Sequence, residues 1–125
     1  MPQTRADVFV FFGATGDLAH KQIFPAIQAL IRLVQLDMPI IGVAKSNWSF
    51  DQLKARAKHS LQHHGDFDAA AYDKLCGQLR YIDGDYSDPE TFTKLHGLLG
   101  AAQRPLYYLA IPPSLFATVA DGLAR

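Results

Sequence analysis

Residues 8–34 read VFVFFGATGDLAHKQIFPAIQALIRLV, and this stretch decides the fold. It opens with an unbroken apolar run that ends at Gly13, which is typical of a strand covered on both faces, as in the centre of a parallel sheet. Beyond the turn, apolar residues recur at the spacing of one helix face, at Ile23, Ile27, Leu30, Ile31 and Val34. The stretch therefore predicts a buried strand, a glycine turn and a helix packed on the sheet.

The turn between that strand and helix has the glycine spacing of a phosphate-binding loop. Gly13 permits dihedrals that a side chain would hinder, Gly16 permits close approach of a ligand, and Ala19 is small enough for tight helix–strand contact. Unpaired N–H groups at the start of the helix, together with its dipole, favour a pyrophosphate. An ordinary strand, turn and helix explains the bare pattern equally well. No Gly-Lys-Ser/Thr follows, so the turn is not a Walker loop.

Size and charge narrow the class of protein. The chain has 125 residues, 49% of them hydrophobic, which suits one domain spanning 1–125. Lys plus Arg equal Asp plus Glu at 12 each, so neither nucleic acid nor a membrane surface is an expected partner. There is no leader pattern and no apolar run long enough to span a bilayer. The sequence predicts a soluble, cytoplasmic protein, and its single cysteine, Cys76, permits no disulfide within the chain.

The rest of the chain alternates between strand-like and helix-like segments. Further buried strands are expected at 40–44, 79–83 and 105–111, and helices near 22–36, 49–64, 66–77, 88–99 and 114–123. Joined by right-handed crossovers, these segments predict an α/β, Rossmann-like parallel sheet in the order 3-2-1-4. Helices should cover both faces of that sheet, in three layers.

Several helix starts carry a specific signal. Pro25 predicts a kink or a fresh start of the first helix near 22–25. Ser49 and Gln52 have the spacing of a capping box. Residues 88–90, Asp-Pro-Glu, combine an N-cap acid with proline at the first helical position. Ser114, after two prolines, is expected to cap the last helix.

Two segments should complete a nucleotide site. Lys45 and Ser46 follow the second strand, where an acidic residue would suit the ribose hydroxyls of NAD and a basic one the 2′-phosphate of NADP. Lys45 therefore favours NADP, although a solvated lysine at a strand end is the simpler alternative. Residues 110–114 follow the fourth strand and should line the crevice opposite residues 13–18, because the carboxyl ends of parallel strands frame such sites.

No metal site is predicted. His59 and His63 lie four apart on a helix, but a third ligand of suitable spacing is not evident, so with His64 they are interpreted as an exposed polar face. Asp83 and its acidic neighbours at 85 and 88 suggest a cation site only weakly, since turn and capping roles explain them.

Two segments resemble one family. FFGATGDLAHKQIFPAI (11–27) is similar to the N-terminal coenzyme segment of glucose-6-phosphate dehydrogenases, and RPLYYLAIPPSLF (104–116) looks like that family's strand ending in Ala, an aliphatic residue, Pro and Pro. The resemblance implies NADP, with the adenosine 2′-phosphate near Lys45 and Ser46. It places the rest of the cofactor over Gly13, Ala14, Thr15, Gly16, Asp17 and Leu18, and the nicotinamide near Ala110, Pro112 and Pro113.

The resemblance also implies an activity, but this sequence departs from the family pattern at several points. The family oxidises C1 of glucose 6-phosphate to a lactone and passes a hydride to the nicotinamide. Here Gln22 stands where the family has a lysine, and Phe116 where some members have a tyrosine. The family's Asp-His-Tyr base motif, its Glu-Lys-Pro motif and its large second domain are not in these residues. Because hydride transfer from a sugar needs a base, the chain is expected to be a coenzyme domain, a fragment or truncated product that does not turn over alone.

Two other interpretations stay open at this point. An NADP-binding or sensing module of the extended short-chain dehydrogenase type also begins with G-A-T-G, but its catalytic Tyr-x-x-x-Lys is absent from the sequence. A non-catalytic interaction fragment is the third. In each case an open sheet leaves an edge and apolar helix faces uncovered, which favours a homo-oligomer.

Overall fold

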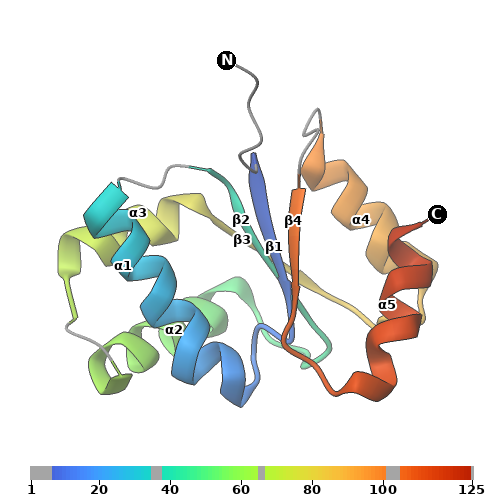
Figure 1. Ribbon diagram of the computed structural model, residues 1–125, viewed down its shortest axis with the longest axis horizontal. Helices are drawn as coiled ribbons and strands as arrows, with labels where there is room; N and C mark the ends of the chain where they lie inside the picture. The colour runs from blue at the N-terminus through green and yellow to red at the C-terminus, as the bar shows by residue number, and fades with distance from the viewer. Residues whose placement is uncertain (1–6, 35–37, 65–66, 101–104, 125) are drawn as a thin grey trace.

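The structure is a computed structural model that describes residues 7–34, 38–64, 67–100 and 105–124 (Figure 1). Strands and helices alternate along the chain. In order they are β1 (Val8–Phe12), the π-helical turn η1 (Ala19–Ile23), α1 (Phe24–Val34), β2 (Ile40–Ala44), α2 (Phe50–His64), α3 (Ala69–Gln78), β3 (Leu79–Asp83), α4 (Pro89–Leu99), β4 (Pro105–Leu109), the 3-10 turn η2 (Pro113–Leu115) and α5 (Phe116–Leu123).

The described strands form one parallel sheet in the order β3-β2-β1-β4. In its register Phe12 stands beside Val43 of β2 and Leu109 of β4, so the strands end at nearly the same level. The predicted order and strand direction are confirmed. The carboxyl ends of all four strands, and the loops that follow them, meet at one edge of the sheet.

Helices cover both faces of the sheet, as predicted. In Figure 1, α1, α2 and α3 lie on one side and α4 and α5 on the other. Side chains of β1 alternate between the two resulting cores: Phe11 packs toward the first, and Val10 and Phe12 pack toward the second. A strand that is buried on both faces gains from apolar residues at every position, which is why the sequence there is an unbroken apolar run.

The first helix begins in two steps, near the predicted position. η1 is closed by the wide π-type hydrogen bond from the N–H of Phe24 to the carbonyl of Ala19, and α1 then starts at Phe24. Pro25 follows at once, near the start of α1, where its missing N–H has little effect.

Two helix caps match the prediction and one does not. The N–H of Ser49 donates to Gln52 Oε1 at 2.7 Å and the N–H of Gln52 to Ser49 Oγ at 3.2 Å, which is a capping box. Asp88 caps α4 by accepting from the N–H of Glu90, with proline in the first turn. The cap predicted at Ser114 is wrong: η2 includes that residue, and α5 starts after it without a side-chain cap.

Three other expectations need correction. β4 ends at Leu109 instead of 111, although the N–H of Ala110 still donates to the carbonyl of Phe12 at 2.9 Å. α3 starts at Ala69 rather than 66, with Asp68 as its N-cap. Leu30 was expected in the core but is 45% exposed, because it faces the side of β4 that no described strand extends. The Val34 side chain and the predicted helix end near 36 lie outside the described residues.

Within the part of the chain that the structure describes, no helix has the length and apolar character needed to cross a bilayer.

Candidate functional site

The glycine turn after β1 is hydrogen-bonded to β2 and packs against the end of β4. The N–H of Gly13 donates to the carbonyl of Val43 at 2.8 Å, and the N–H of Gly16 donates to the carbonyl of Gly13 at 3.0 Å. Gly13 has φ +86°, and a β-carbon at this position would collide with the carbonyl oxygen of Ala110. Only glycine has the freedom for this dihedral and this close approach. The turn therefore lies directly against the end of β4.

A cavity of about 530 Å³ opens at this edge of the sheet. That volume lies in the usual range of ligand pockets. The loops after the four described strands contribute to its lining, with Thr118 of α5. The predicted residues among them are Gly13, Thr15, Gly16, Lys45, Ser46, Ala110 and Pro112, and they are joined by Ala44, Asp85, Tyr86, Ser87, Ile111, Leu115 and Thr118.

Four of the predicted site residues do not line this cavity. Ala14 is fully buried beneath the turn. The Asp17 side chain is 91% exposed and its carboxylate lies 3.6 Å from the Arg56 guanidinium. Leu18 is half-buried, and Pro113 is exposed at the start of η2.

Side chains join the glycine turn to the loop after β2. The hydroxyls of Thr15 and Ser46 lie 2.6 Å apart and share a hydrogen bond. Both residues line the cavity, so a ligand bound there meets the two loops as one surface.

Asp83, the last residue of β3, holds the loop that carries Lys45 and Ser46. Its Oδ1 accepts from the N–H groups of Ser46 and Asn47 and from the Tyr81 hydroxyl, each at 2.9 Å. Burial opposes ionisation of this carboxyl, but hydrogen bonds from Ser46, Tyr81 and Asn47 outweigh it and lower the pKa of Asp83. These bonds agree with the turn role expected for Asp83.

Lys45 does not project freely into the cavity. Its Nζ lies 3.0 Å from Oδ2 of Asp85, in the loop after the neighbouring strand β3, while Oδ1 of Asp85 accepts from the N–H and the hydroxyl of Ser87 at 2.9 and 2.8 Å. The Ser87 N–H and the Lys45 ammonium lower the pKa of Asp85 to about 2. The carboxylate is therefore ionised at neutral pH.

Sequence reasoning missed Tyr86 as a part of the site. Its hydroxyl accepts from the N–H of Gly13 at 3.0 Å and donates to the carbonyl of Val43 at 3.3 Å. Its ring packs edge-on against Phe12 with 5.8 Å between ring centroids. Burial raises the pKa of Tyr86, opposed by the Gly13 N–H, so the phenol stays neutral. Its place just after β3, at the carboxyl edge of the predicted sheet, was the available signal.

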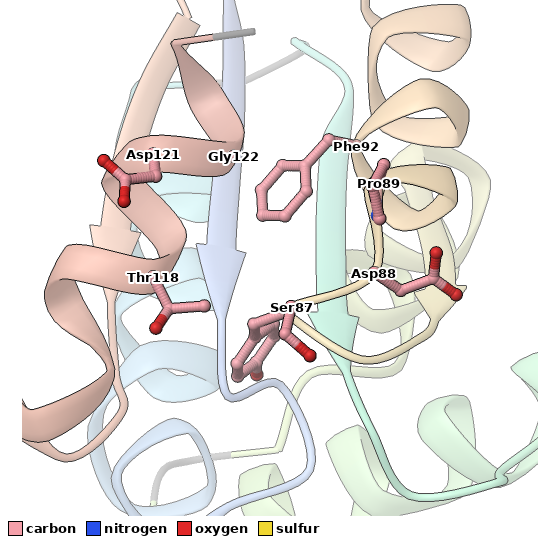
Figure 2. Close-up of a pocket in the computed structure, with 8 residues that line it drawn as sticks. Ser87, Asp88, Pro89, Phe92, Thr118, Asp121 and Gly122 are labelled. Atoms are coloured by element: carbon pink, nitrogen blue, oxygen red, sulfur yellow. The ribbon is translucent and has the colours of Figure 1, made fainter.

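A second cavity, of about 190 Å³, lies between the start of α4 and α5 and shares Tyr86, Ser87 and Thr118 with the first. Figure 2 shows the Phe92 ring between the two helices, while the carboxylates of Asp88 and Asp121 point away from that space. This cavity therefore presents little charge to a ligand, and the larger cavity is the better candidate site.

The histidines of α2 are more than an exposed polar face. His20, which is buried in η1, joins two of them: its Nε2 lies 2.7 Å from Nδ1 of His59, and its Nδ1 lies 3.1 Å from Nε2 of His64. Burial, and then the positive charge of Arg56, lower the pKa of His20. Within the described residues, no group of three or more His, Cys, Asp or Glu side chains has a geometry that could hold a metal.

Comparison with known proteins agrees with this geometry. A family model described as "Glucose-6-phosphate dehydrogenase, NAD binding domain" matches residues 10–125. The chain belongs to the glucose-6-phosphate dehydrogenase family. The matched region is described as the family's NAD binding domain, so this chain is a nucleotide-binding domain.

Relatives within the glucose-6-phosphate dehydrogenase family are found in bacteria and eukaryotes. Glucose-6-phosphate 1-dehydrogenase 1 of Mycobacterium tuberculosis (strain ATCC 25618 / H37Rv) is 44% identical over 120 residues, which are 96% of this chain and 26% of that protein. The Saccharomyces cerevisiae enzyme is 37% identical over an alignment of 128 positions, which covers 93% of this chain and 25% of that protein. The chain thus spans about a quarter of the length of the curated relatives it matches.

Solved structures of the glucose-6-phosphate dehydrogenase family have the same fold. The crystal structure of glucose-6-phosphate 1-dehydrogenase from Mycobacterium avium superposes with a TM-score of 0.91 at 44% identity, over 98% of this chain and 27% of that one. A glucose-6-phosphate dehydrogenase in complex with its substrate glucose-6-phosphate gives a TM-score of 0.84 at 31% identity, over 98% of this chain and 28% of that one. These matches give no support to the short-chain dehydrogenase alternative.

Proposed function

We propose that this chain is the NADP-binding domain of a glucose-6-phosphate 1-dehydrogenase, an enzyme that oxidises glucose 6-phosphate to 6-phosphogluconolactone in the pentose phosphate pathway. The observation that carries this proposal is the cavity itself, in which the glycine turn and the Lys45-Ser46 loop form adjacent walls. NADP would supply the hydride acceptor when bound. The curated relatives named above are glucose-6-phosphate 1-dehydrogenases, which supports the reaction.

The residues of the cavity suit the parts of this cofactor. Gly16 leaves the backbone of the turn open to a pyrophosphate, Gly13 lets the turn lie against the end of β4, and the start of the helical segment adds partial positive charge. A basic side chain beside a hydroxyl, Lys45 with Ser46, suits a 2′-phosphate. Ala110 and Pro112, at the end of β4, form the wall assigned to the nicotinamide end.

The same cavity supports a binding role rather than catalysis by this chain alone. Among the residues that the structure describes, its titratable side chains are Lys45, Asp85 and Tyr86. Lys45 and Asp85 pair with each other, and the Tyr86 hydroxyl is bonded to backbone groups. Removing the proton of a sugar hydroxyl needs a base within hydrogen-bond reach. We therefore propose that residues 1–125 act as one nucleotide-binding unit and that the glucose 6-phosphate site lies in the part of the family's length that this chain does not span.

Calorimetric titration of the 125-residue chain tests the proposal. We expect binding of NADP that is tighter than binding of NAD, and loss of this preference in Lys45→Gln. Lys74→Gln is the matched control, because Lys74 is an exposed lysine on α3, outside the cavity. A chain that releases no heat with either dinucleotide would refute the proposal. Steady production of NADPH from glucose 6-phosphate by this chain would refute its non-catalytic part.

We also propose that the chain self-associates through the open side of β4. Leu106 and Tyr108 on β4 are 53% and 44% exposed, and Leu30 of α1 is 45% exposed beside them along one apolar groove. Exposed apolar edges of this kind favour pairing between copies. Sedimentation velocity should show larger species at high concentration, which Leu106→Lys removes. A monomer at all concentrations would contradict this. The cytoplasmic location, and the lack of nucleic-acid or membrane partners, stay predictions from composition.

A further inference from the structure

We propose that Asp85 is a specificity-determining residue of the nucleotide site, which weakens the preference for a 2′-phosphorylated dinucleotide by competing for Lys45. This inference rests on the proposed function, since it concerns the same cavity. It starts from an ion pair that joins two residues forty positions apart, one in the loop after β2 and one in the loop after β3.

The position of the Asp85 carboxylate is set by its own turn. Oδ1 accepts two hydrogen bonds from Ser87, so Oδ2 faces Lys45 Nζ at 3.0 Å. The Lys45 side chain is 68% exposed and the Asp85 side chain 43% exposed, and both line the cavity. A ligand anion that reaches the Lys45 ammonium therefore also meets an ionised carboxylate beside it.

Opposite consequences follow for the two dinucleotides. A 2′-phosphate carries nearly two negative charges, so it is repelled by Asp85 and must share Lys45 with it. A free ribose hydroxyl is neutral and donates hydrogen bonds, and a carboxylate accepts them. Asp85 thus weakens NADP binding and leaves NAD binding unchanged or strengthens it. Its effect is opposite to that of Lys45, which favours NADP.

The rival role for Asp85 is a positioning one, in which it holds Lys45 in place for the phosphate. The two roles give opposite signs. If Asp85 competes, removing its charge strengthens NADP binding; if it only positions Lys45, removing its charge weakens NADP binding.

Asp85→Asn separates these roles, because asparagine keeps an oxygen that can accept from Ser87 while it loses the charge. Calorimetric titrations of the 125-residue chain with NADP and with NAD are compared for the wild type, Asp85→Asn and Asp73→Asn. Asp73 lies on α3, outside the cavity, and controls for the change in net charge.

We expect Asp85→Asn to bind NADP about three- to tenfold more tightly than the wild type, as the Coulomb energy of a nearby charge pair in water allows. NAD affinity should stay unchanged or fall, and Asp73→Asn should match the wild type. The gain should shrink in about 0.5 M salt because the charges are exposed.

Two results would overturn the inference in distinguishable ways. If the wild type prefers NADP and Lys45→Gln loses that preference, while Asp85→Asn leaves the NADP-to-NAD ratio unchanged or lowers it, the competing role of Asp85 is wrong and the proposed function stands. If the wild type binds neither dinucleotide, the proposed function fails and this inference fails with it.

Discussion

Gly13 and Ala110 meet backbone to backbone at the carboxyl ends of β1 and β4. The space that a β-carbon on Gly13 would occupy is taken by the carbonyl oxygen of Ala110, and the N–H of Ala110 bonds to the carbonyl of Phe12. Where these two residues line the cavity, they therefore meet through main-chain atoms on both sides. The shape of the cavity there depends on the absence of a single side chain.

Gly13→Ala should destabilise the fold and abolish dinucleotide binding. The new methyl group meets the Ala110 carbonyl, and φ +86° is strained for alanine, so we expect a loss of at least about 2 kcal/mol in the free energy of unfolding. Urea denaturation and calorimetry measure the two effects. Gly97→Ala is the control: Gly97 lies in α4 with open space around it, and alanine there should stabilise by about 0.5–1 kcal/mol. Equal unfolding free energies and equal dinucleotide affinities of the two variants would show that the close approach of Gly13 to Ala110 is not needed.

Tyr86→Phe should loosen the glycine turn without removing the aromatic packing. The variant loses the hydroxyl that joins Gly13 and Val43, while the Gly13 N–H keeps its bond to the Val43 carbonyl. We expect a loss of about 0.5–1.5 kcal/mol in unfolding free energy, together with weaker NADP binding. Tyr108→Phe, on the exposed edge strand, should change neither. A Tyr86→Phe variant as stable as the wild type would contradict this role.

Asp83→Ala should lower both stability and NADP affinity. It removes the acceptor of three hydrogen bonds and frees the loop that carries Lys45 and Ser46. The expected loss of unfolding free energy is about 1–3 kcal/mol, from donors left without their partner. Asp121→Ala is the control, since that carboxylate points away from the neighbouring cavity (Figure 2). Urea denaturation measures the stability and calorimetric titration the NADP affinity. The prediction is wrong if both keep their wild-type values in Asp83→Ala.

Mild acid should destabilise the protein through His20. Because the folded-state pKa of His20 is lowered from 6.5, the unfolded chain binds more protons below that pH, and unfolding free energy falls as pH decreases toward the folded pKa. The groups that face His20 are Arg56, His59, His63 and His64, and all of them oppose its protonation. Urea midpoints at about pH 7.5 and about pH 5.5 measure the effect.

His20→Gln should lose less stability over the same pH interval than the wild type does. His96→Gln, a change in an exposed histidine of α4, should keep the wild-type pH dependence. If the wild type and His20→Gln lose the same unfolding free energy between the two pH values, the buried imidazole does not cause the destabilisation in acid.

Most of the fold followed from local patterns in the sequence. The apolar run of β1, the positive φ of Gly13 and the capping box of Ser49 and Gln52 are each local features, so their spacing along the chain is sufficient evidence. The strand order followed from the handedness of crossovers, which depends on the direction of the chain and not on particular side chains. Ser114 was mispredicted because the preceding prolines start a 3-10 turn that includes it.

Tertiary structure alone decided which polar side chains contact one another. The Lys45–Asp85 pair, the bond between Tyr86 and Gly13, and the contacts of His20 with α2 join residues that lie 39 to 73 positions apart. Periodicity can place such residues at the same edge of a sheet or between the same two helices. It cannot determine which polar atoms come within bonding distance, because that depends on side-chain rotamers and loop paths set by packing around them.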